Sequence, residues 1–154
     1  MEVGQAGTPV TIEITRDAIS AYAARMSNPN PAYQTQADIT DGDAEMLAMP
    51  TMIFAAAPVR RYDIAGNNGF VALERVRENP RQTPFAKCEV RWFAPIRAGD
   101  RIVSLGRVID KYERRGNKFV TFRVEATNQH GEKVAEYDYT SIFEYAMGPE
   151  EARR

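Results

Sequence analysis

Apolar and polar residues alternate along four segments in the second half of the chain, which predicts four β-strands. The segments span residues 86–93, 101–113, 118–127 and 132–145. A bend over 94–100 joins the first two, and tight turns at 114–117 and 128–131 join the others. We therefore expect the strands to pair in series as an antiparallel meander with one apolar face.

The first half of the chain opens with a shorter strand and a helix. Residues 10–14 alternate as a strand, and Thr15 is a suitable N-cap for an amphipathic helix over 16–26. That helix must end at its next residues, because Asn28 and Asn30 each precede a proline and such residues are pushed out of the helical region. The two Asn-Pro steps predict a stiff, extended, polar loop.

A second helix is expected to begin at Pro50, since proline suits the first turn of a helix. Residues 52–59 are almost wholly apolar, and we expect a helix from Pro50 to Tyr62 that Pro58 kinks. A short strand over 70–75 follows. As the most apolar helix, the second one is the expected cover for the sheet.

The patterns together predict an α+β fold, in which a curved antiparallel β-sheet wraps around a central buried α-helix. We expect a single domain over residues 1–148 and a charged C-terminal tail at 149–154. A chain of 154 residues is long enough to bury a substantial core.

The composition excludes several classes of function but does not identify one. The net charge of −1 gives no electrostatic footprint for nucleic acid or an anionic membrane, and no apolar run is long enough to span a bilayer. The N-terminus lacks a secretion signal, and the single Cys88 is expected to be a half-buried strand residue. These features predict a cytoplasmic protein.

An acidic stretch and a single histidine are possible sites for metal binding or catalysis. Asp38, Asp41, Asp43 and Glu45 lie close together, but they lack the remainder of a calcium-binding loop, so we expect a solvated acidic loop and no metal. The one histidine, His130, falls in a predicted hairpin turn, and we expect it to be a surface residue.

Several motifs nevertheless resemble one known family. They are the Asn-Pro loop, the helix start Ala48-Met49-Pro50-Thr51, the signature Phe93-Ala94-Pro95-Ile96-Arg97-Ala98-Gly99-Asp100 and the turn Asn128-Gln129-His130-Gly131-Glu132. Over roughly residues 10–143 the chain resembles the MaoC-like hot-dog dehydratases and hydratases, within them the FAS1-like dehydratase branch. The resemblance implies the hot-dog fold and lyase chemistry on acyl thioesters of coenzyme A or acyl carrier protein, such as enoyl-CoA hydration in fatty acid metabolism. It implies no cofactor.

The family's catalytic loop reads Asp-x-Asn-Pro-x-His, and here two of its positions differ. Asn30-Pro31 keeps the core of the motif, but Asn28 stands at the aspartate position and Tyr33 at the histidine position. A general base should titrate near the working pH, whereas an amide does not titrate and tyrosine has a reference pKa of about 10. We therefore assign no catalytic residue.

The same resemblance gives the expected substrate-binding residues: Asn28, Asn30, Pro31, Tyr33, Pro50, Thr51 and Met52. In the family a backbone N–H at the start of the buried helix polarises the thioester carbonyl. Pro50 has no N–H, so Thr51 or Met52 is the expected donor.

Three hypotheses follow from this sequence. The first, which we favour, is a subunit that supplies the acyl-binding and structural half of a double hot dog, beside a homologous partner with the intact Asp and His. The second is a self-sufficient homodimeric enoyl-CoA hydratase or other thioester enzyme with a variant site. The third is a non-enzymatic acyl-CoA-binding protein.

Overall fold

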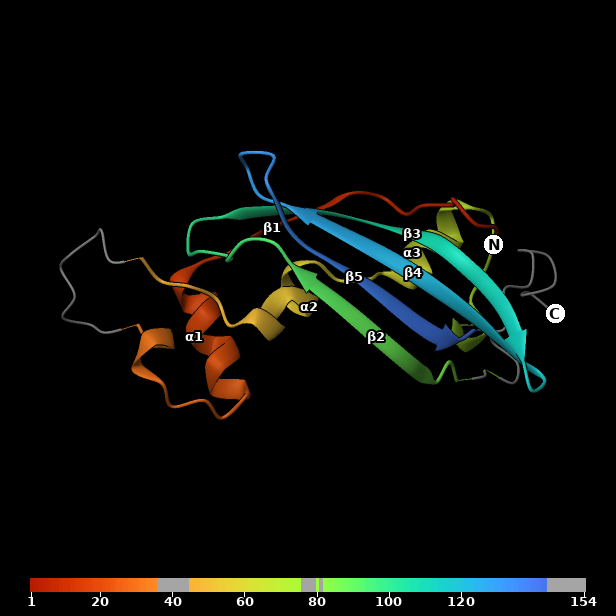
Figure 1. The fold of residues 1–154 in the computed structure, drawn as a ribbon, viewed down its shortest axis with the longest axis horizontal. Helices are drawn as coiled ribbons and strands as arrows, with labels where there is room; N and C mark the ends of the chain where they lie inside the picture. Colours follow the sequence, from red (N-terminus) through yellow and green to blue (C-terminus); the bar gives the residue numbers. More distant parts are fainter. Residues whose placement is uncertain (36–44, 76–79, 81, 144–154) are drawn as a thin grey trace.

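Five antiparallel strands form one curved sheet, and the helices lie against one of its faces (Figure 1). This computed structural model describes residues 1–35, 45–75, 80 and 82–143. The strands are β1 (Val10–Glu13), β2 (Phe85–Trp92), β3 (Arg101–Arg114), β4 (Asn117–Thr127) and β5 (Lys133–Ile142). The helices are α1 (Arg16–Arg25), α2 (Ile53–Ala56) and α3 (Arg61–Asn67), with the 3₁₀ turns η1 (Pro31–Tyr33), η2 (Pro50–Met52) and η3 (Leu73–Arg75).

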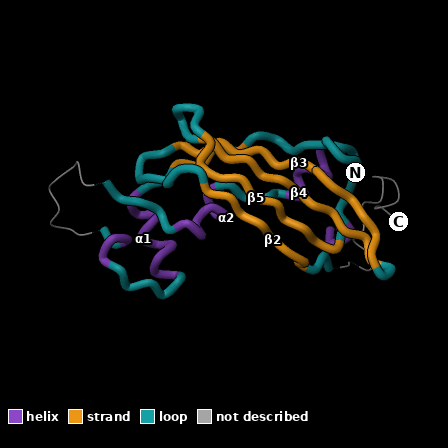
Figure 2. The backbone as a smooth tube through the Cα atoms, viewed as in Figure 1, coloured by secondary structure: helices purple, strands orange, loops and turns teal. Residues whose placement is uncertain are grey.

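Five of the six predicted strands are confirmed, and three of them pair in series. Residues 144–145 of the last predicted strand and the predicted tail at 149–154 lie outside the described residues. β3, β4 and β5 follow one another through hairpins, and Gly116 and Gly131 take the positive φ that each turn needs (Figure 2). In both pairs a register shift of one residue marks a bulge, at Val108/Asp110 and at Ala126/Thr127, and such bulges increase the bend of a sheet.

The position of β2 differs from the predicted meander. The strand order is β1-β3-β4-β5-β2, so β2 lies at the edge of the sheet beside β5 rather than beside β3. β1 and β4 already occupy both sides of β3, which leaves β2 the free side of β5. The segment between β2 and β3 consequently crosses from one edge of the sheet to the far side of β4. A hydrogen bond of 2.8 Å from the Ala48 N–H to the Ile96 carbonyl holds this segment in place.

Helix α1 is confirmed, with Thr15 as its N-cap. The Thr15 Oγ1 accepts a hydrogen bond from the Ala18 N–H at 3.0 Å. The predicted strand over 70–75 is wrong, because this segment is tied to α3 instead of the sheet. The Phe70 N–H donates to the Ala65 carbonyl, and Glu74 in η3 forms an ion pair with Arg61 at 2.9 Å.

The predicted buried helix is broken rather than kinked. α2 ends at Ala56, Pro58 cannot donate to a helical ladder, and Arg60 adopts the left-handed conformation with φ 44° and ψ 48° before α3 begins. The Ala57 carbonyl at the break accepts a 2.5 Å hydrogen bond from the hydroxyl of Tyr137 on β5. The broken helix still covers the sheet, so the predicted arrangement of a curved sheet around a central helical segment is confirmed.

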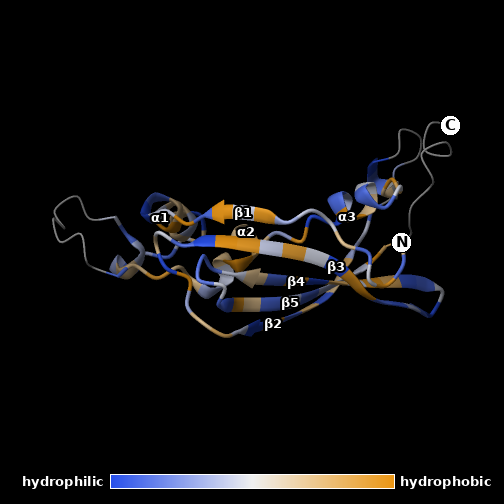
Figure 3. Cartoon of the chain, turned by 90° about the horizontal axis from the view of Figure 1, so that it is seen from above, coloured by the Kyte–Doolittle hydropathy of each residue, from blue (hydrophilic) through white to orange (hydrophobic). Residues whose placement is uncertain are grey.

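The core consists of two clusters of buried residues between the helices and the sheet. Figure 3 shows hydrophobic and hydrophilic residues alternating along β3, as expected of a strand with one buried face. The larger cluster surrounds α2 and includes Ile53, Val124 and Tyr137. The smaller one surrounds α3, where the Phe122 and Phe143 rings meet edge to face with their centroids 5.6 Å apart. Each helix therefore contributes its own buried cluster.

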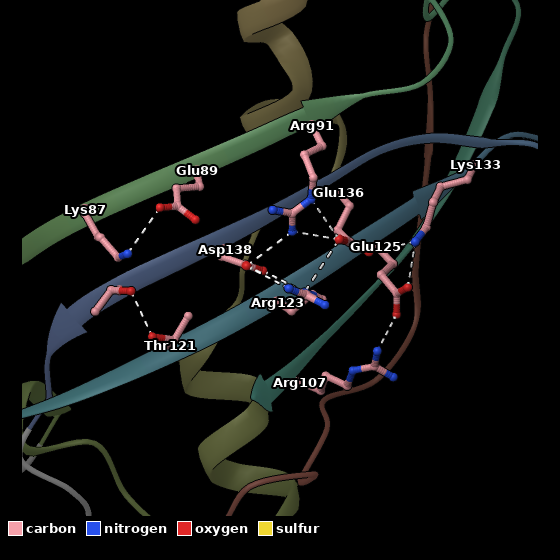
Figure 4. Close-up of polar contacts among 11 residues, drawn as sticks. Lys87, Glu89, Arg91, Arg107, Thr121, Arg123, Glu125, Lys133, Glu136 and Asp138 are labelled. Atoms are coloured by element: carbon pink, nitrogen blue, oxygen red, sulfur yellow. Dashed lines mark hydrogen bonds and ion pairs between the residues drawn. The ribbon is translucent and has the colours of Figure 1, made fainter. Parts of the chain in front are cut away.

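The opposite face of the sheet carries a network of alternating charges (Figure 4). Arg123 on β4 binds Asp138 on β5 through two hydrogen bonds of 2.7 and 2.8 Å, and Arg91 on β2 binds Glu136 at 2.7 Å. Hydrogen bonds from Arg123 hold the pKa of Asp138 below its usual range despite its burial. The network ties β4, β5 and β2 together across the outer surface.

Candidate functional site

The C-terminus of α1 places the first residue of the Asn-Pro turn. Ser27 adopts the left-handed conformation with φ 53°, the Ser27 N–H donates to the Ala24 carbonyl at 3.0 Å, and the Asn28 N–H donates to the Ala23 carbonyl at 2.9 Å. These two bonds form a Schellman motif, which ends a helix and reverses the chain. Asn28 is therefore held at a fixed position directly after the helix.

The two asparagine side chains shape the turn itself. The Asn28 Oδ1 accepts from the Asn30 N–H, and the Asn30 Oδ1 accepts from the Ala32 N–H, both at 3.0 Å. The Asn28 Nδ2 points to the start of the buried helix and donates to the Met49 sulfur at 3.6 Å. Asn30 is exposed and serves as the N-cap of η1. Both amides therefore hold backbone structure, and Asn28 also joins the turn to η2.

The start of the buried helix offers one free backbone donor. The Met52 N–H already donates to the Met49 carbonyl at 2.9 Å, and its side chain is buried. Within the part of the chain that the structure describes, the Thr51 N–H has no acceptor. Of the two predicted donors, Thr51 is thus the one able to meet a ligand. The Pro50 carbonyl accepts from the Trp92 Nε1 at 3.2 Å, which ties η2 to the end of β2.

The segment before η2 pairs with the connection that follows β2. Leu47 and Arg97 form an isolated antiparallel bridge, and the Ala98 N–H donates to the Met46 carbonyl at 2.8 Å. Glu45 forms an ion pair with Arg97. Asp38, Asp41 and Asp43, the other carboxylates of the acidic stretch, lie outside the described residues. This pairing brings the signature that begins at Phe93 beside the start of the buried helix.

A cavity of about 630 Å³ opens between these elements. Its lining comes from the Asn-Pro turn, the segment before the buried helix, and the end of β2 with its connection: Tyr33, Leu47, Ala48, Met49, Pro50, Trp92, Phe93, Ala94, Pro95 and Ile96. Trp92 and Phe93 are 51% and 57% exposed, which is unusual for rings of their size. We take this cavity as the candidate site.

The candidate site has aromatic and aliphatic walls, and its described lining contains no carboxylate, histidine or lysine side chain that could act as a general base. Among the described residues that line it, Tyr33 is the only one with a titratable group. His130 is exposed in the β4–β5 turn, where its backbone N–H donates to Asn128, and this confirms its predicted surface position. Cys88 is half-buried on β2, as predicted, and burial raises the pKa of its thiol. The geometry can bind an apolar ligand beside the start of the buried helix, where Thr51 follows the lining residue Pro50 but does not itself line the cavity.

The structure brings together some of the predicted substrate-binding residues and separates others. Tyr33 and Pro50 line the cavity, and Asn28 contacts Met49 in its wall. Asn30 and Pro31 are exposed on the turn outside the lining, and the Met52 side chain packs into the core. Sequence reasoning missed Trp92 and Phe93, although two adjacent large aromatic residues at the end of an alternating strand are a visible signal.

Comparisons with known proteins give one matching family and several relatives. The family described as "FAS1-like, dehydratase domain region" matches residues 1–137. A "UPF0336 protein" of Saccharopolyspora erythraea is 28% identical over 123 residues, which cover 79% of this chain and 75% of the relative. The match to the family therefore includes both halves of the candidate site.

Two solved structures share the fold. The HadBC complex of Mycobacterium tuberculosis, a (3R)-hydroxyacyl-ACP dehydratase, superposes with a TM-score of 0.63 at 19% identity, over 94% of this chain and 100% of that one. The R-hydratase PhaJ1 of Pseudomonas aeruginosa gives a TM-score of 0.62 at 21% identity, over 94% and 84%. These similarities confirm the hot-dog fold. In the described part of this chain, no helix has the length and hydropathy to cross a membrane.

Proposed function

Because the chain belongs to the family of the FAS1-like dehydratase domain region, we propose that it is the acyl-binding half of a double hot dog. Its substrate is an enoyl or (3R)-hydroxyacyl thioester of coenzyme A or acyl carrier protein. A homologous partner that carries the catalytic Asp and His performs the proton transfers of hydration and dehydration. The HadBC complex, itself a (3R)-hydroxyacyl-ACP dehydratase, is a precedent for such an assembly.

The observation that carries this proposal is a well-formed binding cavity whose described lining lacks an acid–base pair. The turn around Asn28 is held by a Schellman motif and joined to Met49, and the free Thr51 N–H lies at the start of the buried helix. These features suit the binding of a thioester. Tyr33 is the only titratable residue in the described lining, so the proton transfers need groups from elsewhere.

The unpaired edge of β2 supports the proposal of a partner subunit. β2 pairs with β5 on one side, and on its other side no strand pairs with it among the described residues. Exposed aromatic side chains stand at both ends of this edge, with Phe85 at the start of the strand and Trp92 and Phe93 at its end. The strand itself also carries Lys87, Glu89 and Arg91, so the apolar contacts are at its ends. An unpaired edge strand presents free backbone N–H and C=O groups with which another chain can pair. We infer that β2 of the partner completes the sheet here.

Antiparallel pairing of two β2 strands would place the second cavity of each subunit beside the candidate site of the other. The end of β2 at Trp92 borders the candidate site, and its start at Phe85 borders a second cavity. When the strands run in opposite directions, the Phe85 end of this chain meets the site end of the partner. The second cavity would then receive the acyl chain of a thioester held by the partner's catalytic residues.

Reconstitution tests the proposal. The chain is purified alone and together with a hot-dog subunit that keeps the Asp-x-Asn-Pro-x-His loop, and hydration of crotonyl-CoA and longer enoyl-CoAs is followed by absorbance. We expect turnover of long substrates only by the mixture. Two other results would contradict the proposal: robust hydration by the chain alone, which indicates a self-sufficient enzyme, or thioester binding that no partner converts to turnover, which indicates a binding protein.

A further inference from the structure

The second cavity has a volume of about 630 Å³ and lies between the break after α2 and the first half of β2. It is lined by Phe54, Pro58, Val59, Arg60, Arg61, Phe85, Cys88, Tyr137 and Tyr139. The rings of Phe54 and Tyr137 meet edge to face with centroids 5.1 Å apart, and those of Phe85 and Tyr139 lie 5.3 Å apart. The wall therefore carries four aromatic rings. The charged residues in it are two arginines, with no carboxylate among the described lining residues.

The break in the buried helix positions one of these arginines. Arg60 is held in the left-handed conformation, which is unfavourable for a residue other than glycine. It lines both the second cavity and a neighbouring cavity of about 460 Å³, so it stands where the two meet. Strained backbone of this kind persists where the surrounding structure or the function requires the side chain.

Arg60 is the less engaged of the two arginines. Arg61 donates to Glu74 at 2.9 Å and to the Tyr62 hydroxyl at 3.0 Å. Among the described residues, the carboxylate nearest to Arg60 is that of Asp63, whose Oδ1 lies 3.6 Å from the Arg60 Nη2. The other oxygen of that carboxylate already accepts from the Thr8 N–H at 2.8 Å. The Arg60 side chain is also 47% exposed. Its guanidinium is thus able to bind a further anion.

We propose that the second cavity binds an acyl group that ends in a carboxylate, and that Arg60 recognises this carboxylate. The aromatic walls formed by Phe54, Tyr137 and Tyr139 suit the methylene chain, and the cation at the far end suits the acid. The substrate class would be thioesters of dicarboxylic acids rather than of simple fatty acids. This inference rests on the proposed function, since it assigns the ligand of the same acyl-binding subunit.

Paired ligands test the specificity. Adipoyl-CoA and hexanoyl-CoA have six-carbon acyl chains and differ at the far end. Their binding to the complex of this chain with its catalytic partner is measured by calorimetry, and the same comparison is made from five to eight carbons. At low salt we expect the carboxylate-ended ligand of the best length to bind about fivefold more tightly, as for an exposed ion pair. Binding of the methyl-ended ligand at least as tightly at every length would overturn the inference.

Three variants identify the residue responsible. Arg60→Gln should abolish the preference, Arg60→Lys should keep part of it, and Arg115→Gln should leave it unchanged. Arg115 is a matched control, because it is an exposed arginine that also adopts the left-handed conformation, with φ 51°, in the β3–β4 hairpin. Circular dichroism checks that each variant is folded, and Arg60→Gly provides a second test because glycine relieves the strain.

The remaining outcomes separate the two proposals. A preference that survives in Arg60→Gln and Arg60→Gly overturns the role of Arg60. Equal weakening of hexanoyl-CoA and adipoyl-CoA by these variants also overturns it, because Arg60 would then bind the phosphates of coenzyme A. If no acyl-CoA binds at all, the proposed function itself fails, whereas tight binding of hexanoyl-CoA with no preference defeats only the inference.

Discussion

The hydrogen bond between Tyr137 and Ala57 joins the sheet to the break in the buried helix, and Tyr137→Phe removes that bond alone. The Tyr137 hydroxyl donates to the Ala57 carbonyl at 2.5 Å, and both residues are almost completely buried. The substitution keeps the ring and its contact with Phe54, but leaves a buried carbonyl without a donor. An unsatisfied buried group of this kind costs about 1–3 kcal/mol, so we expect the free energy of unfolding to fall by about 2 kcal/mol.

Urea denaturation followed by circular dichroism measures this change, and Tyr139→Phe is the matched control. Tyr139 lies two residues along the same strand, is only half-buried, and its hydroxyl makes no hydrogen bond with the described residues, so we expect a loss below about 0.5 kcal/mol. Equal losses for the two variants would refute the role of the Tyr137 bond.

The same tyrosine gives a prediction at high pH. Burial raises the pKa of Tyr137 above that of a free tyrosine. Its contribution to stability is therefore present below about pH 10, the pKa in the unfolded chain, and is lost as the pH rises through the folded value. The free energy of unfolding should fall more steeply above pH 10 in the wild type than in Tyr137→Phe. Parallel curves for the two proteins would contradict this assignment.

Three further changes test the outer network, the site and its anchor. Asp138→Asn should cost about 1–3 kcal/mol at neutral pH. Hydrogen bonds from Arg123 lower the pKa of Asp138, so the wild type should lose stability as the pH falls below about 4. Urea titrations should show a smaller loss over this pH range in Asp138→Asn. The double variant Asn28→Asp/Tyr33→His should gain crotonyl-CoA hydration by about 100-fold or more over the wild type in an absorbance assay, since a positioned acid–base pair contributes at least that much. Trp92→Phe removes the bond to the Pro50 carbonyl and should cost about 1 kcal/mol in urea denaturation, while it also weakens calorimetric binding of acyl-CoA.

Each of these changes has an outcome that would contradict it. An unchanged acid transition in Asp138→Asn would mean that the ionised carboxylate does not stabilise the fold. A folded double variant without activity would mean that more than two side chains are missing from the site. Wild-type stability in Trp92→Phe would mean that η2 is held by its other contacts, such as the pairing of Ala48 with Ile96.

Strand existence and the first helix were predictable from the sequence because both depend on local patterns. Alternation over residues 101–113 corresponds to β3, and Thr15 before an amphipathic segment corresponds to the N-cap of α1. The place of β2 in the sheet was not predictable in this way, because strand order depends on which edges are already occupied. Its partner β5 is distant in sequence, and nothing in the alternation of 86–93 selects β5 over β3.

The candidate site was predictable in position but not in its details. The Asn-Pro steps correctly indicated the end of α1 and a polar loop after it, but part of this loop is the 3₁₀ turn η1 rather than extended chain. The resemblance to a known family indicated its neighbour at Pro50. The left-handed Ser27 and Arg60 could not be expected, since neither is a glycine or asparagine, the residues that usually adopt this conformation. The Met52 N–H is used within the local 3₁₀ turn η2, which a prediction of one continuous α-helix from Pro50 did not include. The second cavity opens behind the break at Pro58 and depends on tertiary packing between that break and β2.

We propose that this chain binds a thioester without moving its protons, and the decisive measurement is the hydration of crotonyl-CoA by the purified chain alone. We expect the wild type to show no turnover above that of Tyr33→Phe and Asn28→Ala, although all three proteins bind acyl-CoA in calorimetry. Robust turnover by the wild type that falls in either variant would contradict the claim, because it would show that Asn28 or Tyr33 takes part in the chemistry.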